Sequence, residues 1–191
     1  MHQLLRPLAR ALPPSTRGMS SSLVPRIYVG GDGFGEELKN SVVSHLEKKG
    51  YSVVDKGIGK YYEKAADVAI AVQQEEGAID IARGMLFCGT GMGVSLIANK
   101  FTGIRAAVVE NEFAARASRS INDSNILCMG GLITSSEDAT NIVDAWLAQE
   151  HQKPPVTAES GMPAWWSSEV EDFLASKWQE IEDIEKRSRS S

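Results

Sequence analysis

Cysteine, histidine and long apolar runs are scarce in this sequence, and each scarcity excludes a class of structure. The chain of 191 residues has two cysteines, Cys88 and Cys128, and neither belongs to a CxxC pair or a Cys/His cluster. The three histidines are too scattered for a zinc site, so no metal is expected. No apolar run reaches the roughly 20 residues of a membrane-spanning helix, so no membrane contact is expected either.

Positive charge is also in short supply. Lys and Arg total 20 against 25 Asp and Glu, which gives a net charge of −5. Because nucleic-acid binders usually present a basic surface, nucleic acid is disfavoured as a partner. The length is sufficient for one domain with a substantial core and some additional sequence at the ends.

Residues 1–25 differ from the rest in composition. They contain several Arg, Ser and Pro residues and no acidic residue, which is typical of an organelle transit peptide. Arginines interrupt the short apolar stretch, and this argues against a secretory signal. We therefore expect residues 1–25 to direct the protein to the mitochondrion or plastid. The alternative is a disordered tail, or a true start at Met19, on a cytoplasmic protein.

Between residues 26 and 151, short apolar runs alternate with helical patterns. The runs typical of strands lie at 26–31, 51–57, 84–89, 104–109 and 125–131. The helical patterns lie at 35–49, 62–76, 93–100, 112–120 and 135–150. Five strand–helix repeats predict an α/β domain, a Rossmann-like open parallel sheet of five strands in a three-layer α/β/α arrangement. In the second helix, Ala66, Ala69, Ile70 and Val72 are expected to face the core.

Residues 152–191 form a separate region. A Pro- and Gly-containing linker leads into a helical pattern over 167–186, which Ser168 and Glu171 are expected to open as a capping box. Its apolar stripe must be buried against the domain or a partner subunit. The stripe consists of Val170, Phe173, Leu174, Trp178 and Ile181.

Two glycine-rich loops follow the first and third strands, GGDGFGEE at 30–37 and CGTGMGVS at 88–95. In open parallel sheets, ligands bind at the carboxyl ends of the strands, where such loops lead into helices. Free backbone N–H groups and a helix N-terminus favour a phosphate or another oxyanion. A dinucleotide is the alternative, with Asp55 holding its ribose, but Glu36 and Val94 stand where GxGxxG requires its last glycine.

The segment FCGTGMGVSLIANKFTGIRAAVV at 87–109 resembles the CGTGxGxSIAANKxxGIRAA signature of ribose-5-phosphate isomerase type B and the galactose-6-phosphate isomerase subunits. VGGDGFGEELK resembles that family's GCDHAGFELK, SINDSNIL resembles HNDxNVL, and IVDAWL recurs identically. The resemblance covers about residues 26–150. SINDSNIL and PAWWSSEVEDFL are closer still to the isomerase-like half of plant proteins labelled DNA-damage-repair/toleration.

The resemblance implies an aldose–ketose isomerase of a sugar phosphate that needs no cofactor. Such an enzyme moves a proton between C1 and C2 through an enediolate, which requires a base and donors for the developing oxyanion. By resemblance, Cys88 is the base, with its thiolate favoured by the adjacent helix N-terminus, and Asp32 binds sugar hydroxyls. The anion hole would consist of Thr90 and the amides of Gly89, Gly91 and Gly93.

Three further positions match residues of the family. Asn99 matches a pocket residue, Arg119 matches an arginine, and Asn122 corresponds to a residue contributed across a dimer interface. The resemblance therefore implies a homodimer or a higher homo-oligomer.

The sequence departs from the family where the substrate's ring and phosphate are handled. Gly33 replaces a phosphate-binding histidine, Ile121 replaces the ring-opening histidine, and HQKPPVTAES replaces an arginine-containing segment. Substitute cations could come from Lys100, Arg105, Arg116 and Arg119. A short open-chain substrate such as a tetrulose phosphate needs no ring opening, and a differently bound pentose phosphate is the other option. The alternative function is a non-catalytic sugar-phosphate-binding or partner subunit, although the joint retention of Cys88, Thr90 and Asp32 favours catalysis.

Overall fold

The computed structural model of the chain describes residues 26–75, 82–157 and 160–189, so the predicted transit peptide lies outside the described residues. Strands and helices alternate as predicted, and one further helix follows. In chain order they are β1 (Arg26–Gly31), α1 (Glu36–Lys48), β2 (Ser52–Ile58), α2 (Tyr61–Gln74), β3 (Arg83–Cys88), α3 (Met92–Ala98), β4 (Ala106–Val108), α4 (Glu112–Asn122), β5 (Ile126–Gly130), α5 (Ser136–Ala148) and α6 (Ser168–Arg189).

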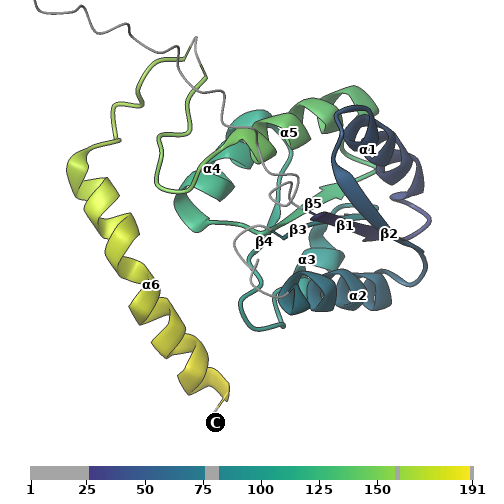
Figure 1. Cartoon of the computed structure of the whole chain (residues 1–191), viewed down its shortest axis with the longest axis horizontal. Coiled ribbons are helices and arrows are strands. Elements are labelled where there is room, and N and C mark those ends of the chain that lie inside the picture. Colours follow the sequence, from purple (N-terminus) through teal and green to yellow (C-terminus); the bar gives the residue numbers. More distant parts are fainter. Residues whose placement is uncertain (1–25, 76–81, 158–159, 190–191) are drawn as a thin grey trace, which may run out of the picture.

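The five strands form one parallel sheet in the order β2-β1-β3-β5-β4. Helices α1, α4 and α5 cover one face of the sheet, and α2 and α3 cover the other (Figure 1). The prediction of a three-layer open parallel α/β sheet is confirmed. Because all strands run the same way, their carboxyl ends share one edge of the sheet, called here the carboxyl edge, and their amino ends share the opposite amino edge.

Successive side chains of the central strands enter two different cores. Met85 and Phe87 of β3 pack under α1 and α5, whereas Leu86 and Cys88 pack under α2 and α3. Residues of β3 from Gly84 onward are buried, which explains why this strand reads as a continuous apolar run rather than as an alternating one.

Helix α2 turns a different face to the sheet from the one predicted. Ala65, Val68, Ala69 and Val72 are buried, whereas Ile70 is 37% exposed. The observed set follows the i, i+3, i+4, i+7 spacing of a regular apolar stripe. The prediction for Ile70 was therefore wrong. The segment is rich in apolar residues, so its spacing fits an inward face that contains Ile70 as well as the observed face that contains Val68.

Helix α6 extends past the β4 side of the sheet, and most of its length is exposed (Figure 1). Leu174 is 1% exposed, whereas Phe173 is 63% exposed, so only part of the predicted stripe is buried against the chain's own domain. The capping-box prediction was wrong: Glu171 accepts a hydrogen bond from the Trp166 indole at 2.7 Å, and the hydroxyl of Ser167 accepts one from the amide of Val170 at 3.4 Å. No helix within the described ranges is long and apolar enough to cross a membrane.

Candidate active site

The two predicted glycine loops lie side by side at the carboxyl edge. Gly31 at the end of β1 pairs with Phe87 of β3, and the amide of Asp32 donates to the Phe87 carbonyl at 3.0 Å. A Cβ atom on Gly35 would lie 2.5 Å from the Phe87 carbonyl carbon, so glycine allows the two backbones to touch. The sequence prediction that Asp32 and Cys88 share one edge therefore agrees with the structure.

Cys88 ends β3 with its thiol turned into the loop that follows. Its Sγ accepts a hydrogen bond from the Gly91 amide at 3.1 Å, and 5% of the residue is exposed. Gly91 has a φ of 75°, a conformation that favours glycine, and it allows the loop to curl back over the sulfur. Thr90, on the same loop, is exposed, and its hydroxyl accepts from the Met92 amide at 3.4 Å.

Asp32 is held by its own loop. Its Oδ1 atom accepts hydrogen bonds from the amides of Phe34 at 3.0 Å and Gly35 at 3.2 Å. In the described part of the chain, Oδ2 has no hydrogen-bond partner, which leaves it available to an external donor such as a hydroxyl group. The carboxylate is thus oriented before any ligand binds.

A third loop, which sequence reasoning missed, completes this edge. After β5, the amide of Gly131 donates to the Cys88 carbonyl at 2.8 Å, and that of Leu132 donates to the Gly89 carbonyl at 3.0 Å. A Cβ on Gly130 would lie 2.6 Å from the backbone of Thr90. The Gly-Gly pair after the fifth strand was the available signal, but such a pair alone does not distinguish a site from a turn.

A pocket of about 410 Å³ opens beside Asp32. Asp32, Gly33 and Phe34 form one side of it, and residues 59–62 at the start of α2 form the other. The ring of Tyr61 reaches the second glycine loop, because a Cβ on Gly93 would lie 3.1 Å from it. The two tyrosines were also missed, although Gly59, Lys60, Tyr61 and Tyr62 directly follow the second strand.

The remaining predicted site residues lie at the amino edge, opposite Cys88. The Asn99 side chain donates to the carbonyl of Ala106 at 2.9 Å and accepts from its amide at 2.8 Å, at the first residue of β4. The buried Arg119 forms an ion pair with Asp123 at 2.7 Å. Asn99 and Asn122 together line a pocket of about 360 Å³. Within one chain, the structure does not bring these residues to Cys88.

Two of the proposed substitute cations, Lys100 and Arg105, also lie at the amino edge. Arg105 forms an ion pair with Asp123 at 2.6 Å, and Lys100 is exposed just after α3. Asp55, the residue that a dinucleotide site would require, forms an ion pair with Lys39 and accepts from the Gly57 amide at 2.7 Å. The Asp55 carboxylate is therefore already occupied within the fold. It does not offer the ribose contact that a dinucleotide site would require.

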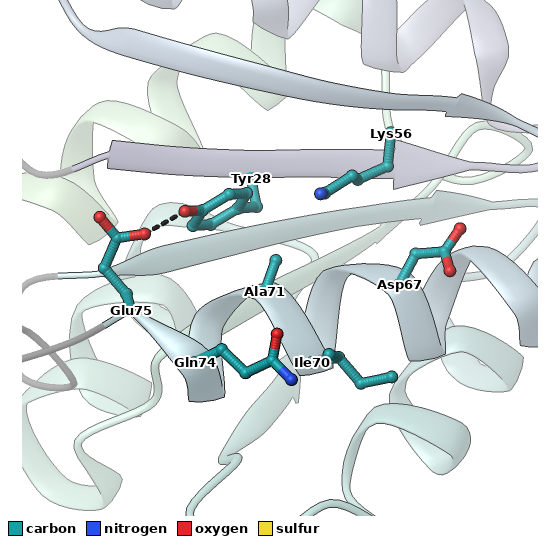
Figure 2. Close-up of a pocket in the computed structure, with 7 residues that line it drawn as sticks. All are labelled: Tyr28, Lys56, Asp67, Ile70, Ala71, Gln74 and Glu75. Carbon is teal, nitrogen blue, oxygen red and sulfur yellow. Dashed lines mark hydrogen bonds between the residues drawn. The ribbon is translucent and has the colours of Figure 1, made fainter.

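A separate groove of about 470 Å³ runs along α2 beside β1 and β2 (Figure 2). The hydroxyl of Tyr28 donates to Glu75, as Figure 2 shows. The Lys56 ammonium lies 5.4 Å from the centre of the tyrosine ring. Burial raises the pKa of Tyr28 above its ordinary value, and the hydrogen bond to Glu75 adds to the rise. None of the predicted site residues lines this groove, so it is distinct from the candidate site.

Comparison with known proteins identifies the family of the chain. A family model described as Ribose/Galactose Isomerase matches residues 27–159. The DNA damage-repair/toleration protein DRT102 of Arabidopsis thaliana is 37% identical over 161 residues, which cover 84% of this chain and 50% of that protein. The chain therefore spans about half the length of this relative.

Bacterial relatives are matched over most of their own length. Ribose-5-phosphate isomerase B of Escherichia coli is 41% identical over 132 residues, covering 66% of this chain and 86% of that protein. D-erythrulose-4-phosphate isomerase of Pectobacterium atrosepticum is 33% identical over 128 residues, with coverages of 66% and 84%. The structure of ribose-5-phosphate isomerase B from Clostridium thermocellum superposes with a TM-score of 0.70 at 36% identity, covering 85% of this chain and 99% of that one. The chain belongs to the ribose/galactose isomerase family.

Proposed function

We propose that the protein is an aldose–ketose isomerase of a sugar phosphate and that Cys88 is its base. The observation that carries the proposal is the position of the Cys88 thiol in a glycine-lined loop whose backbone touches the loop that orients the carboxylate of Asp32. A structural cysteine needs neither the loop nor the carboxylate.

The roles of the residues follow from the reaction. The Cys88 thiolate removes the proton from C2 of the aldose, and the electron pair moves toward the carbonyl oxygen on C1 to form an enediolate. Return of the proton to C1 and transfer of the hydroxyl proton from O2 to O1 give the ketose. The amides of the 89–93 loop and the hydroxyl of Thr90 stabilise the oxyanion. Oδ2 of Asp32 accepts a hydrogen bond from a sugar hydroxyl.

We propose a short open-chain substrate, such as a tetrulose phosphate. Ile121 stands where the family has its ring-opening histidine, so this chain lacks that residue. A four-carbon sugar phosphate has no ring to open and does not require it. The similarity to a D-erythrulose-4-phosphate isomerase supports this choice. A pentose phosphate bound in a different way remains the other candidate.

A homodimer is part of the proposal. Apolar side chains on or beside the Cys88 loop are exposed in the single chain: Phe34 and Leu132 lie beside Gly89, and Met92 and Leu96 lie on α3. Exposed large apolar side chains of this kind are typical of an interface. Asn122, at the opposite edge of its own sheet, could reach Cys88 only in another copy. Light scattering of the purified protein measures its oligomeric state directly.

The decisive experiment follows proton exchange at C2 by NMR in D₂O with a panel of four- and five-carbon aldose and ketose phosphates. We expect exchange and interconversion with at least one of them. Cys88→Ala should reduce the rate about a thousandfold, within the range of a general base. Cys128→Ala is the matched control, because Cys128 is fully buried two residues before the end of β5, and it should retain the wild-type rate per folded molecule.

The non-catalytic alternative has one observation in its favour, namely that only 5% of Cys88 is exposed in the single chain. Binding of a sugar phosphate without exchange at C2 on any member of the panel would support it. Full turnover by Cys88→Ala would instead leave an isomerase but remove Cys88 as its base.

A further inference from the structure

Helix α6 is attached to the rest of the chain mainly through one short segment. Leu174 is 1% exposed, and one turn further on Lys177 donates to the carbonyl of Ile121 in the last turn of α4. Trp178 is half-buried, whereas residues 179–184 are all exposed. The docking of α6 therefore depends largely on the segment from Leu174 to Trp178.

His151 contacts this segment from the loop that follows α5. Its ring packs edge-on against the indole of Trp178, with 5.6 Å between the two ring centres. The next residue, Gln152, donates from its side-chain amide to the carbonyl of Leu174 at 3.2 Å. Two consecutive residues of one loop thus hold the buried part of α6.

The position of the His151 ring favours its neutral form. The Nε2 atom is buried and has no hydrogen-bond partner in the described part of the chain. Protonation puts an N–H group on both ring nitrogens, so it would bury a charged donor at Nε2 without an acceptor. A buried charged donor without a partner costs more free energy than a neutral ring nitrogen in the same place.

Charged groups from α6, α4 and the start of β4 face His151. Burial lowers the pKa of His151 below its ordinary 6.5, and Asp123, the C-cap of α4, opposes this shift. Three cations add to the lowering: Lys177 of α6, Arg119 of α4 and Arg105 just before β4. The net effect agrees with the buried Nε2 atom, because the docked helix disfavours the charged imidazole.

We propose that His151 makes the docking of α6 pH-sensitive, so that protonation of its ring releases the helix from the rest of the chain. Release allows water to solvate both ring nitrogens, and it moves Trp178 and Lys177 away from the new charge. The proposal does not depend on isomerase activity.

Release of α6 would open the amino edge. Trp178 and Ile181 of α6 form one wall of the pocket of about 360 Å³ that Asn99 and Asn122 also line. A groove of about 560 Å³ lies between α6 and residues 102–105. Both spaces lose a wall when the helix leaves, so pH controls whether this edge of the sheet is covered.

The direction of the pH effect follows from the lowered pKa of His151. The docked state binds the proton less tightly than the released state, in which His151 has its ordinary pKa of 6.5. Docking is therefore fully stabilised above about pH 6.5 and weakens as pH falls below that value. We expect the equilibrium constant for release to rise at least about fivefold between pH 8 and pH 5.

Hydrogen exchange of the full chain, followed by mass spectrometry, measures this release. Peptides from 168–189 are compared with peptides from α5, after correction for the intrinsic pH dependence of exchange. We expect α6 to lose protection below pH 6.5 while α5 keeps it. Equal protection of α6 at pH 8 and pH 5 would overturn the proposal, and so would a parallel loss in α5, which would indicate global unfolding.

Two variants assign the effect to His151. His151→Phe keeps an aromatic ring against Trp178 but cannot be protonated, so the protection of α6 should be the same at pH 8 and pH 5. The matched control is His45→Gln, which removes a histidine bonded to Asp144 between α1 and α5 and should keep the wild-type pH dependence. If His151→Phe displaces α6 at every pH, His151→Gln provides the same test with a smaller neutral side chain. A pH dependence that persists without His151, or disappears without His45, contradicts the assignment.

NMR titration of the wild-type chain tests the assignment without relying on a variant that docks normally. The ring protons of His151, identified by their absence from His151→Phe, should titrate below pH 6.5, in the range where α6 loses protection. Titration at or above pH 6.5 would exclude His151 as the group that controls docking. Because none of these measurements requires turnover, failure here is distinguishable from failure of the isomerase proposal.

Discussion

The two edges of the sheet are built by opposite means. At the carboxyl edge, three loops touch through backbone atoms, and glycines at 31, 35, 130 and 131 stand where a side chain would collide with the backbone of a neighbouring strand or loop. At the amino edge, the contacts are made by long charged side chains, with Arg105 and Arg119 sharing Asp123.

This difference shows what each edge can offer to a ligand. Backbone packing holds amide N–H groups and the buried Cys88 in fixed positions, which suits a reaction that develops negative charge. At the amino edge the field comes from full charges, and its strength depends on how well Asp123 balances the two guanidinium groups paired with it. The carboxyl edge should therefore tolerate almost no added side-chain volume at its contact glycines. The amino edge should tolerate added volume but not the loss of Asp123.

The largest effect is expected from adding one methyl group to the carboxyl edge. In Gly35→Ala the new Cβ would lie 2.5 Å from the carbonyl carbon of Phe87, which belongs to the backbone of a buried strand. One of the loops must move, and we expect a loss of about 3 kcal/mol in the free energy of unfolding. Urea denaturation followed by circular dichroism measures it.

Gly33→Ala is the matched control, in the same loop. A Cβ on Gly33 would meet nothing within 4 Å, so the free energy of unfolding should change by less than about 0.5 kcal/mol. Equal losses in the two variants would show that general loop flexibility, and not backbone contact, sets the requirement for glycine.

A smaller effect is expected from neutralising the acid of the amino edge. Asp123→Asn keeps a residue type that accepts the left-handed φ of 46°, but it leaves Arg105 and Arg119 without the carboxylate that they share. We expect a loss of about 2 kcal/mol, less than for a fully buried pair because the Asp123 side chain is 21% exposed. Thermal unfolding at low salt measures this loss, which should shrink as salt is added.

The control for this variant is Asp67→Asn. Asp67 pairs with Lys64 at 3.0 Å on α2 and is 48% exposed, so its loss should cost about 0.5 kcal/mol or less. If Asp123→Asn were no more destabilising than Asp67→Asn, the cations of the amino edge would not depend on Asp123.

The sequence was informative about the carboxyl edge and largely silent about the amino edge, for a physical reason. Residues 29–39 and 87–95 are continuous segments, and strand, glycines, cysteine and helix follow one another there, so the edge could be predicted. The loop at Gly130 and Gly131 was missed because its role depends on which strand lies next to β5, and local spacing does not reveal strand order.

The ion pairs around Asp123 could be predicted from spacing only in part. Arg119 and Asp123 lie one helical turn apart at the end of α4, but Arg105 comes from the start of β4, and local spacing does not place it there. The same limit explains the error on α2: the local pattern allows Ile70 as well as Val68 to face inward, and the packing of β1 and β3 decides between them.

The smallest effect is expected at Asp144, an acid with its partners in balance. This residue of α5 accepts from His45 at 2.9 Å and from Lys49 at 2.6 Å, at the end of α1. Burial raises the pKa of Asp144, but the hydrogen bonds from Lys49 and His45 lower it by more, so the folded-state pKa lies below the ordinary 3.8. The resulting stabilisation is therefore present above about pH 4 and is lost as pH falls through the folded-state pKa.

Asp144→Asn should accordingly lower the free energy of unfolding by about 0.5 kcal/mol at neutral pH, a small value because the side chain is 37% exposed. The difference from wild type should narrow below pH 4, where Asp144 becomes protonated in both folded and unfolded chains. Urea denaturation at several pH values measures this, with exposed Asp172→Asn on α6 as the control. A difference that stayed constant down to the acid transition would mean that Asp144 acts through packing rather than through charge. In that case the difference between Asp144 and Asp123 could not be attributed to their charged partners.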